Sequence, residues 1–182
     1  MDDRRRLFHL FAQVLEYPGS SLLASAGECA RRLEKSCPEA AEYMRAFAAF
    51  AEGTGLDRME EIYTRTFDIT PTANLYVGYH LFGESFKRGA FLVKLQEAYE
   101  AHGFAFGPEL ADHLSVILRF VSVVDDPLFV DPLVEEGVLP LLEKVEEAFK
   151  ESSGGYALVI SSLGLFLRQE CPAIAAGGLH HD

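Results

Sequence analysis

The sequence predicts an all-α protein, a single-domain bundle of roughly eight to ten helices. Apolar residues recur at the three- and four-residue spacing of a helix face along most of the 182 residues. No long stretch alternates apolar and polar residues as a half-buried strand would. Several prolines and glycines stand between the periodic segments, where they end helices. We expect residues 1–170 to form the domain and residues 171–182 to be a mobile tail.

Four helices are expected in the first 70 residues. The first has an apolar face over 7–15 and ends before Pro18. The second ends at Pro38, and the third ends at Gly53. Asp57 is placed to cap the fourth helix. The side chains of this fourth helix expected to point inward are Met59, Ile62, Tyr63 and Phe67.

The second half of the chain continues the helical pattern with one irregular segment. Residues 74–86 are aromatic and rich in glycine, and they predict a short helix and a turn. A clear helix follows over about 87–102, and Gly103 is placed to be its left-handed C-terminal cap. Further helices are expected over 128–150, interrupted midway, and over 156–168.

Three polar side chains stand at the start of the helix that Pro108 is expected to begin. Glu109 would lie one turn before Asp112 and His113, on the face opposite the apolar stripe that begins at Leu110. Carboxylates in a first helical turn stabilise the positive end of the helix dipole by about 0.3–1 kcal/mol each. The alternatives are a binding role, and metal or acid–base chemistry. A zinc site of the HExxH kind would need a second histidine four residues away, which this stretch lacks.

The charge of the chain limits the partners it can bind. The formal net charge is −12. Such a surface repels nucleic acid and anionic lipid, and it attracts a basic peptide. The longest apolar run has roughly 12 residues, fewer than the about 20 that a membrane span needs. We therefore expect no nucleic-acid partner and no insertion into a membrane.

Cysteines and motifs point to an intracellular protein without catalytic activity. The three cysteines have no CxxC spacing, which fits a reducing cytoplasm better than a disulfide framework. The arginines near the N-terminus precede an amphipathic helix and not an export signal. No GxSxG, Walker or GxGxxG motif occurs. The sequence therefore predicts a cytoplasmic protein that is not an enzyme and that binds no metal or cofactor permanently.

Three short blocks follow one another along the middle of the chain. They read EEIYTRTFD at 60–68, HLFGESFKRG at 80–89 and ELADHL at 109–114. In this order and spacing the blocks resemble the NarJ family, the assembly chaperones for respiratory nitrate reductase and related molybdenum enzymes. That family belongs to the wider TorD/DmsD group of redox-enzyme maturation proteins. The resemblance covers about 60–123, and Ala111 stands where the family usually has proline.

The resemblance implies an all-helical fold without catalysis. It also implies a partner: the N-terminal segment of the apo catalytic subunit of a molybdoenzyme, nitrate reductase or a related enzyme. The chaperone holds this segment until the molybdenum–pterin (bis-MGD) cofactor, which belongs to the client, has been inserted. Such segments carry, or are remnants of, twin-arginine signals, with basic residues before an apolar, helix-prone stretch. The resemblance also leaves a homodimer as one possibility, because some relatives in the wider group exchange helices between protomers.

Two other functions stay open. One is a structural adaptor subunit of a redox complex, and the other is a metal-dependent hydrolase that uses Glu109, Asp112 and His113. Under the chaperone hypothesis, aromatic side chains line an apolar groove, and Glu109 and Asp112 accept hydrogen bonds from a client arginine. Arg88 would pair with Glu84 or Asp68. The residues expected to contact the client are Tyr63, Phe67, Asp68, Tyr79, His80, Phe82, Gly83, Glu84, Arg88, Glu109, Asp112 and His113.

Overall fold

The computed structural model describes residues 2–151 and 154–170 of the chain. All regular secondary structure in this described part is helical, apart from one isolated bridge between Tyr76 and His113. The all-α prediction is therefore confirmed. The expected mobility of residues 171–182 concerns a segment outside the described residues. Within the described ranges, no helix has both the length and the apolar character that crossing a membrane requires.

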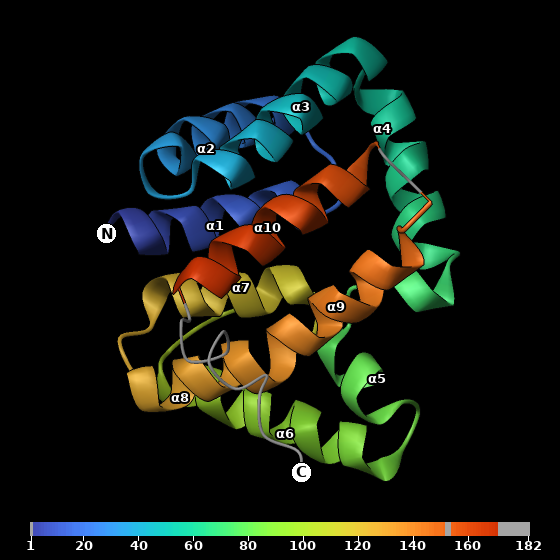
Figure 1. Ribbon diagram of the computed structural model, residues 1–182. Helices are drawn as coiled ribbons and strands as arrows, with labels where there is room; N and C mark the ends of the chain where they lie inside the picture. Colours follow the sequence, from blue (N-terminus) through green and yellow to red (C-terminus); the bar gives the residue numbers. More distant parts are fainter. Residues whose placement is uncertain (1, 152–153, 171–182) are drawn as a thin grey trace, which may run out of the picture.

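One half of the molecule is a stack of long helices around α1 (Asp3–Leu15). Helix α1 lies between α2 (Leu22–Ser36) and α7 (Leu114–Val123), and α10 (Tyr156–Glu170) crosses in front of it (Figure 1). Helix α3 (Pro38–Thr54) packs on both α2 and α10. Helix α1 therefore contacts helices from both the N-terminal and the C-terminal part of the chain, and it lies at the centre of the core.

The apolar stripe expected on α1 is the centre of this core. Leu7, Leu10, Phe11, Val14 and Leu15 are all buried. The ring of Phe11 stacks on Phe166 of α10 at a centroid distance of 5.7 Å. Asp2 caps the helix, since its Oδ1 accepts a hydrogen bond of 2.8 Å from the backbone N–H of Arg5. The apolar periodicity thus gives the buried face of this helix, and the cap at Asp2 gives its first turn.

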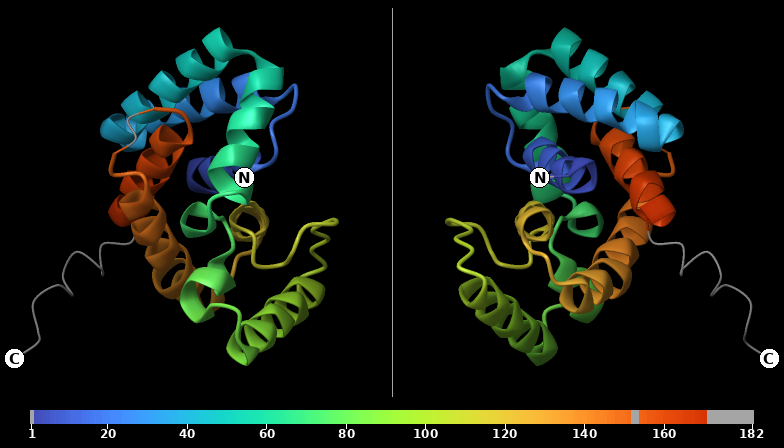
Figure 2. Two further views of the ribbon diagram at one scale, coloured as in Figure 1. Left: turned by 90° about the vertical axis from the view of Figure 1, so that its right-hand side faces the viewer. Right: turned by 90° about the vertical axis from the view of Figure 1, so that its left-hand side faces the viewer.

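The other half of the molecule is a more open arrangement of shorter helices. Helix α5 (Val77–Phe82) packs on α9 (Leu139–Ala148), and α6 (Phe86–Ala101) lies at the margin (Figures 1 and 2). Helix α8 (Pro127–Pro132) runs through η3 (Leu133–Val138) directly into α9. The interruption expected midway in this stretch is absent, because a π-helical turn at η3 carries the chain past it.

The connection between the two halves begins with α4 (Leu56–Tyr63), η1 (Thr64–Asp68) and η2 (Pro71–Ala73). Gly55 stands at the N-cap of α4, so the cap expected at Asp57 is wrong by two residues. Within η1, Phe67 is buried against the ring of Tyr156, at 5.1 Å between centroids. Phe67 is therefore a core side chain.

The predicted start of the helix that carries the third block is wrong. Helix α7 begins at Leu114, and residues 104–113 form a loop before it. The backbone of this loop bonds to the distant segment 75–77: Val77 N–H donates to Asp112 O at 2.9 Å, and Leu114 N–H donates to Leu75 O at 2.7 Å. These bonds replace the intrahelical ones, so the helix cannot start earlier.

The packing of α5 on α6 leaves no room for a side chain at Gly78. A Cβ atom there would lie 2.7 Å from Asp112 Oδ2, 2.9 Å from Phe91 Cδ1 and 3.1 Å from Arg88 Cγ. We expect Gly78→Ala to lower the free energy of unfolding by about 1–3 kcal/mol, since the neighbours are packed. Urea denaturation followed by circular dichroism measures this change.

The matched control is Gly27→Ala in α2, where a Cβ atom would meet nothing within 4 Å. There alanine should raise stability by about 0.5–1 kcal/mol, because it is the better helix former. Equal effects at the two positions would contradict the close packing described at Gly78.

Candidate functional site

A hollow of about 560 Å³ lies between η1, the loop before α7 and the end of α1. We call it the tyrosine hollow, because three tyrosine side chains and several ionisable groups surround it. Its walls are formed by Glu16, Tyr17, Tyr63, Asp68, Tyr76, residues 105–109, His113, Ser115 and Arg119. Four of the residues predicted to bind a client therefore share one cavity: Tyr63, Asp68, Glu109 and His113.

Hydrogen bonds at the backbone and side chains fix the tyrosines of this hollow. The Tyr63 hydroxyl donates to Leu15 O at 3.0 Å, which joins the end of α4 to the end of α1. The Tyr76 hydroxyl donates to Glu109 Oε1 at 3.0 Å, so the carboxylate of the loop is held against the aromatic segment. Burial and this bond to the Glu109 carboxylate raise the pKa of Tyr76 to about 12. Tyr76 thus stays a neutral donor at physiological pH.

Of the three carboxylates that line the hollow, Glu16 pairs with Arg119, whereas Asp68 and Glu109 have no cationic partner among the described residues. Neither Asp68 nor Glu109 forms an ion pair with any residue that the structure describes. Partial burial, and then the negative charge of Glu109, raise the pKa of Asp68 above its ordinary value. The mutual repulsion means that a positive group placed between the two side chains would be bound favourably.

The second carboxylate of the third block does not face the hollow. Asp112 is completely buried and accepts two hydrogen bonds from Arg88, at 3.0 Å to Oδ2 and 3.3 Å to Oδ1. The expected pairing of Arg88 with Glu84 or Asp68 is wrong. The interpretation of Asp112 as an acceptor for a client arginine is also revised, because a buried carboxylate needs a partner inside the fold and Arg88 already occupies both oxygens.

The Arg88 guanidinium also lies over two aromatic rings. Its central carbon is 5.5 Å from the centroid of Tyr76 and 5.9 Å from that of Tyr79. These are cation–π distances. Arg88 therefore connects Asp112 to the aromatic segment and holds Tyr76, the partner of Glu109, in place.

His113 is buried at the N-cap of α7 and faces the hollow with one edge. Its Nδ1 accepts a hydrogen bond from the Ser115 backbone N–H at 3.2 Å, and the Ser115 hydroxyl lies 2.8 Å from the same nitrogen. Burial lowers the pKa of His113, which favours the neutral ring that this cap requires.

The three polar residues of the third block therefore do not converge on one point. Glu109 bonds to Tyr76, Asp112 bonds to Arg88 and His113 bonds to Ser115. In the described ranges, no group of three histidine, cysteine, aspartate or glutamate side chains is arranged to hold a metal ion. The geometry of a metal-dependent hydrolase is absent from this trio.

Other predicted residues lie around two further hollows beside α5. Tyr79, His80 and Gly83 line one of about 590 Å³, together with Glu143 and Glu147 of α9. Burial lowers the pKa of His80, whose Nε2 lies 2.7 Å from the Asn74 carbonyl oxygen.

Phe82 lines a third, largely apolar hollow of about 570 Å³ between α5, α6 and α8. Glu84 is exposed and lines none of the hollows described here. The single groove expected from the aromatic residues is thus replaced by three separate hollows around α5.

Several residues of the tyrosine hollow, among them Tyr17, Tyr76 and Arg119, were not identified from the sequence. Tyr17 forms its rim with a ring 5.6 Å from that of Tyr63, although beside Pro18 it reads only as the end of a helix. Arg119 donates to Phe106 O at 3.0 Å and lies 3.3 Å from Glu16, which holds the loop over the hollow. In the sequence, nothing about a single arginine on an apolar helix indicates that it holds a distant loop in place.

A model of the nitrate reductase delta subunit family matches residues 33–131, more than half of the chain. The chain belongs to this family. The matched region contains the aromatic segment, the Arg88–Asp112 pair and both carboxylates of the tyrosine hollow. The site is therefore built mainly from the part of the chain that defines the nitrate reductase delta subunit family.

Individual relatives agree with the family assignment. The nitrate reductase molybdenum cofactor assembly chaperone NarJ of Escherichia coli K12 is 26% identical over 85% of this chain and 66% of its own length. A Bacillus subtilis 168 protein assigned the same role is 27% identical over 68% of each chain. The chain thus spans just under two thirds of the length of the Escherichia coli relative.

A solved structure shares the fold. An Archaeoglobus fulgidus protein assigned to redox enzyme maturation superposes with a TM-score of 0.62, covering 90% of this chain and 93% of its own. The identity is 20%. This likeness supports the all-helical architecture. The resemblance seen in the three sequence blocks is confirmed by the family match and by these relatives.

The buried ion pair gives a stability prediction. Arg88→Met should lower the free energy of unfolding by about 3–5 kcal/mol, because it leaves the Asp112 carboxylate buried without a partner. Arg88→Met combined with Asp112→Leu should recover most of this loss, since no charge is then left inside. Urea unfolding of the wild type, the single variants and the double variant measures the coupling. Additive losses would contradict the pairing.

The N-cap histidine gives a prediction about pH. Because burial holds the folded-state pKa of His113 below 6.5, the unfolded chain binds the proton more readily. Above pH 6.5 the His113 ring is neutral in both states and does not lower the free energy of unfolding. As the pH falls below 6.5, the unfolded chain takes up the proton first, so the free energy of unfolding should decrease.

The variant His113→Asn keeps an acceptor at the N-cap and removes the titrating ring, so its stability should change less between pH 7 and pH 5. His80 and His9, whose pKa values burial also lowers, remain in both proteins and cancel in the comparison. Identical pH profiles for the two proteins would contradict the assignment.

Proposed function

We propose that this protein is an assembly chaperone for a molybdoenzyme, nitrate reductase or a related enzyme, and that it acts in the cytoplasm without catalysing a reaction. It binds the N-terminal segment of the apo catalytic subunit and holds the subunit until the cofactor is inserted. The observation that carries the proposal is the pair of carboxylates, Asp68 and Glu109, which face the tyrosine hollow and form no ion pair with a described residue, whereas Arg119 in the same hollow pairs with Glu16. The names of the NarJ relatives support it.

The chemistry of the tyrosine hollow suits the basic end of such a segment. A guanidinium or ammonium group between Asp68 and Glu109 would form charge-assisted hydrogen bonds and remove their mutual repulsion. The rings of Tyr17, Tyr63 and Tyr76 offer apolar and cation–π contacts to the same side chain. The net charge of −12 attracts a basic segment over a longer range and raises the rate of association.

The molybdenum–pterin cofactor belongs to the client in this proposal. The cofactor carries phosphate groups, and a protein with a net charge of −12 attracts such anions poorly. The chaperone therefore acts on the protein part of the apo subunit. Binding in the micromolar range, about −8 kcal/mol, would let the client leave after insertion.

The alternative function is a permanent adaptor subunit of a redox complex, which the family's description as a delta subunit favours. The two functions differ in the form of the enzyme that is bound. A chaperone is recovered with the cofactor-free catalytic subunit, whereas an adaptor is recovered in equal amounts with the mature, cofactor-loaded enzyme. Co-purification from cells with and without cofactor synthesis separates the two functions.

Binding of a synthetic peptide tests the proposed site. The probe is the N-terminal segment of the nitrate reductase catalytic subunit from the same organism, titrated by isothermal calorimetry. Asp68→Asn combined with Glu109→Gln should weaken binding at least tenfold, because charge-assisted hydrogen bonds contribute about 1.5–3 kcal/mol each. The free energy of unfolding should change little, since both side chains are exposed.

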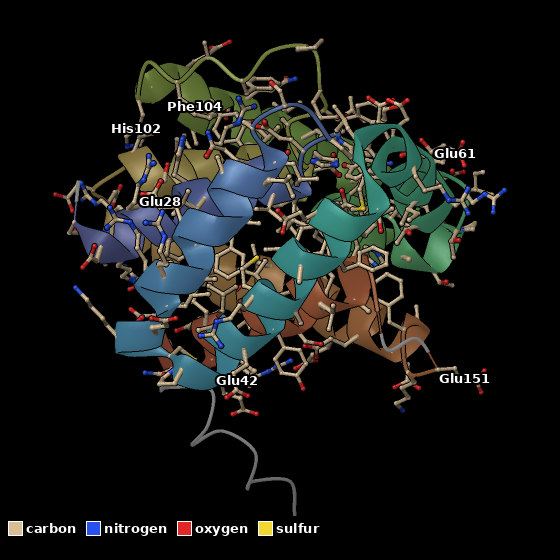
Figure 3. The ribbon with its side chains drawn as sticks, turned by 90° about the horizontal axis from the view of Figure 1, so that it is seen from above. Glu28, Glu42, Glu61, His102, Phe104 and Glu151 are labelled. Atoms are coloured by element: carbon tan, nitrogen blue, oxygen red, sulfur yellow. The ribbon has the colours of Figure 1, made fainter. Side chains whose placement is uncertain are left out.

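A matched control removes the same charge from another face. Glu42 and Glu52 are exposed on α3. Glu42 projects on the opposite side of the molecule from His102 and Phe104, where the loop toward Glu109 begins (Figure 3). Glu42→Gln combined with Glu52→Gln should leave binding nearly unchanged. If both double variants weaken binding equally, the loss comes from the change in net charge alone. That result would contradict the assignment of the site to Asp68 and Glu109.

A further inference from the structure

The tyrosine hollow holds one arginine among its three carboxylates. Arg119 lines it together with Glu16, Asp68 and Glu109. The hollow therefore stays negative overall, although a cation is already present. Within the described ranges, Arg119 pairs with Glu16 and with neither of the other two carboxylates. Glu16 thus differs from Asp68 and Glu109 only in having a partner.

The ion pair between Arg119 and Glu16 is poorly formed. Arg119 Nε lies 3.3 Å from Glu16 Oε1, yet this buried nitrogen donates no hydrogen bond to a described residue. The side-chain hydrogen bond that Arg119 does donate runs from Nη2 to Phe106 O, at 3.0 Å. By contrast, Arg88 gives Asp112 two hydrogen bonds. The side chains of Arg119 and Glu16 are 30% and 41% exposed, and pairs exposed to this degree contribute little to stability.

No local feature of α1 requires a carboxylate at position 16. Glu16 is the C-cap residue of this helix, and its backbone N–H donates to Ala12 O at 3.0 Å. The C-terminal end of a helix is the negative pole of the helix dipole, which disfavours a carboxylate there. Helix α7 packs beside α1 and supplies Arg119 as the compensating cation (Figure 1). Glu16 therefore depends on a positive charge from outside its own helix.

A second polar group in the hollow lacks a partner. The Ser115 backbone N–H can only donate, so His113 Nδ1 is the acceptor and the proton of the neutral ring lies on Nε2. His113 lines the hollow and is only 6% exposed, yet its Nε2 forms no hydrogen bond with a described residue. A ligand that fills the hollow has to offer an acceptor to this donor. A basic peptide has both kinds of group, cationic side chains and main-chain carbonyl oxygens.

We propose that Glu16 is a third client-binding carboxylate, which Arg119 occupies in the free protein and gives up to a basic side chain of the client. This inference rests on the proposed function and adds one residue and its control to the same site. A client guanidinium at Glu16 forms two parallel hydrogen bonds, which the pair with Arg119 lacks. The displaced Arg119 keeps its bond to Phe106 O, and its partly exposed guanidinium turns toward water.

Arg119 then acts as an internal competitor of the client. A client cation reaches Glu16 only by displacing Arg119, so the affinity is lower than three free carboxylates would give. Because Arg119 belongs to the same chain, it is present at a high effective concentration whenever the client side chain moves away. The competition therefore favours release of the client without a change of fold.

Peptide titrations on four proteins test this inference. The probe is the N-terminal peptide of the client, and the proteins are the wild type, Arg119→Met, Glu16→Gln and the double variant. In the wild-type background, Arg119→Met should tighten binding about tenfold, because it frees one carboxylate for a charge-assisted hydrogen bond. In the Glu16→Gln background, the same replacement should change binding far less, because no carboxylate is freed.

The matched control removes an arginine from another arginine–glutamate pair. Arg45 pairs with Glu34 at 2.8 Å, and neither residue lines the hollow. Arg45→Met changes the net charge by the same amount as Arg119→Met. It should leave binding of the peptide nearly unchanged.

The signal of the Arg119 side chain reports the exchange directly. Its Nε–H group can be followed by nitrogen-15 NMR and is identified by its absence from the spectrum of Arg119→Met. Saturation with the peptide should shift this signal, because Glu16 leaves its place beside Nε. An unchanged signal at saturation would reject the exchange.

Three binding results would also overturn the inference. The first is Arg119→Met with the affinity of the wild type. The second is an equal gain in the Glu16→Gln background, which would come from net charge alone. The third is weaker binding by Arg119→Met, which would show that Arg119 supports the site by holding the loop at Phe106.

The variant with Asp68→Asn and Glu109→Gln separates this inference from the proposed function. If that variant binds the peptide like the wild type, the proposed client site fails and the role of Glu16 fails with it. If that variant binds weakly and Arg119→Met brings no gain, the client site stands and only the inference about Glu16 fails.

Discussion

The arrangement of the open half of this protein depends on the ion pair between Arg88 and Asp112. The Asp112 carboxylate is fully buried, and Arg88 supplies it with two hydrogen bonds and an opposite charge inside the fold. The same guanidinium lies against the rings of Tyr76 and Tyr79, and the Asp112 carbonyl accepts from Val77 N–H. One arginine therefore joins α6, α5 and the loop before α7, three elements that bury little apolar surface of their own.

This ion pair also determines where Glu109, one carboxylate of the proposed client site, lies. Glu109 stands three residues before Asp112, and it accepts a hydrogen bond from Tyr76, whose ring lies 5.5 Å from the central carbon of the Arg88 guanidinium. The partner carboxylate, Asp68, lies at the end of η1, and Tyr63 at the end of the preceding α4 is buried and bonded to Leu15 O of the long-helix half. The two charges therefore come from separately anchored elements. Because each element is fixed separately, the negative charges of Asp68 and Glu109 stay near each other. A cationic group that binds in the hollow would relieve their repulsion.

Much of the fold follows from local rules, and the site follows from them only in part. The periodicity of residues 7–15 predicts both α1 and its buried face, and Gly103 has the left-handed backbone expected of a cap, with φ +64°. The start of α7 could not be predicted, because backbone bonds between segments about 35 residues apart override the local signals of Pro108 and Glu109. The partner of Asp112 and the place of Tyr17 in the hollow depend on the same long-range contacts. The three sequence blocks contain four residues of the tyrosine hollow, Tyr63, Asp68, Glu109 and His113, but they do not indicate the neighbours of these residues in space.

The state of the Asp68 carboxyl group tests the central claim most directly. Its pKa can be followed by carbon-13 NMR of the side-chain carboxyl in the free protein and at saturation with the client peptide. The account predicts a pKa above the ordinary value of 3.8 in the free protein and a marked fall when the basic peptide binds. A peptide that binds tightly while the Asp68 titration stays unchanged would contradict it, because the positive group would then lie somewhere other than between the two carboxylates.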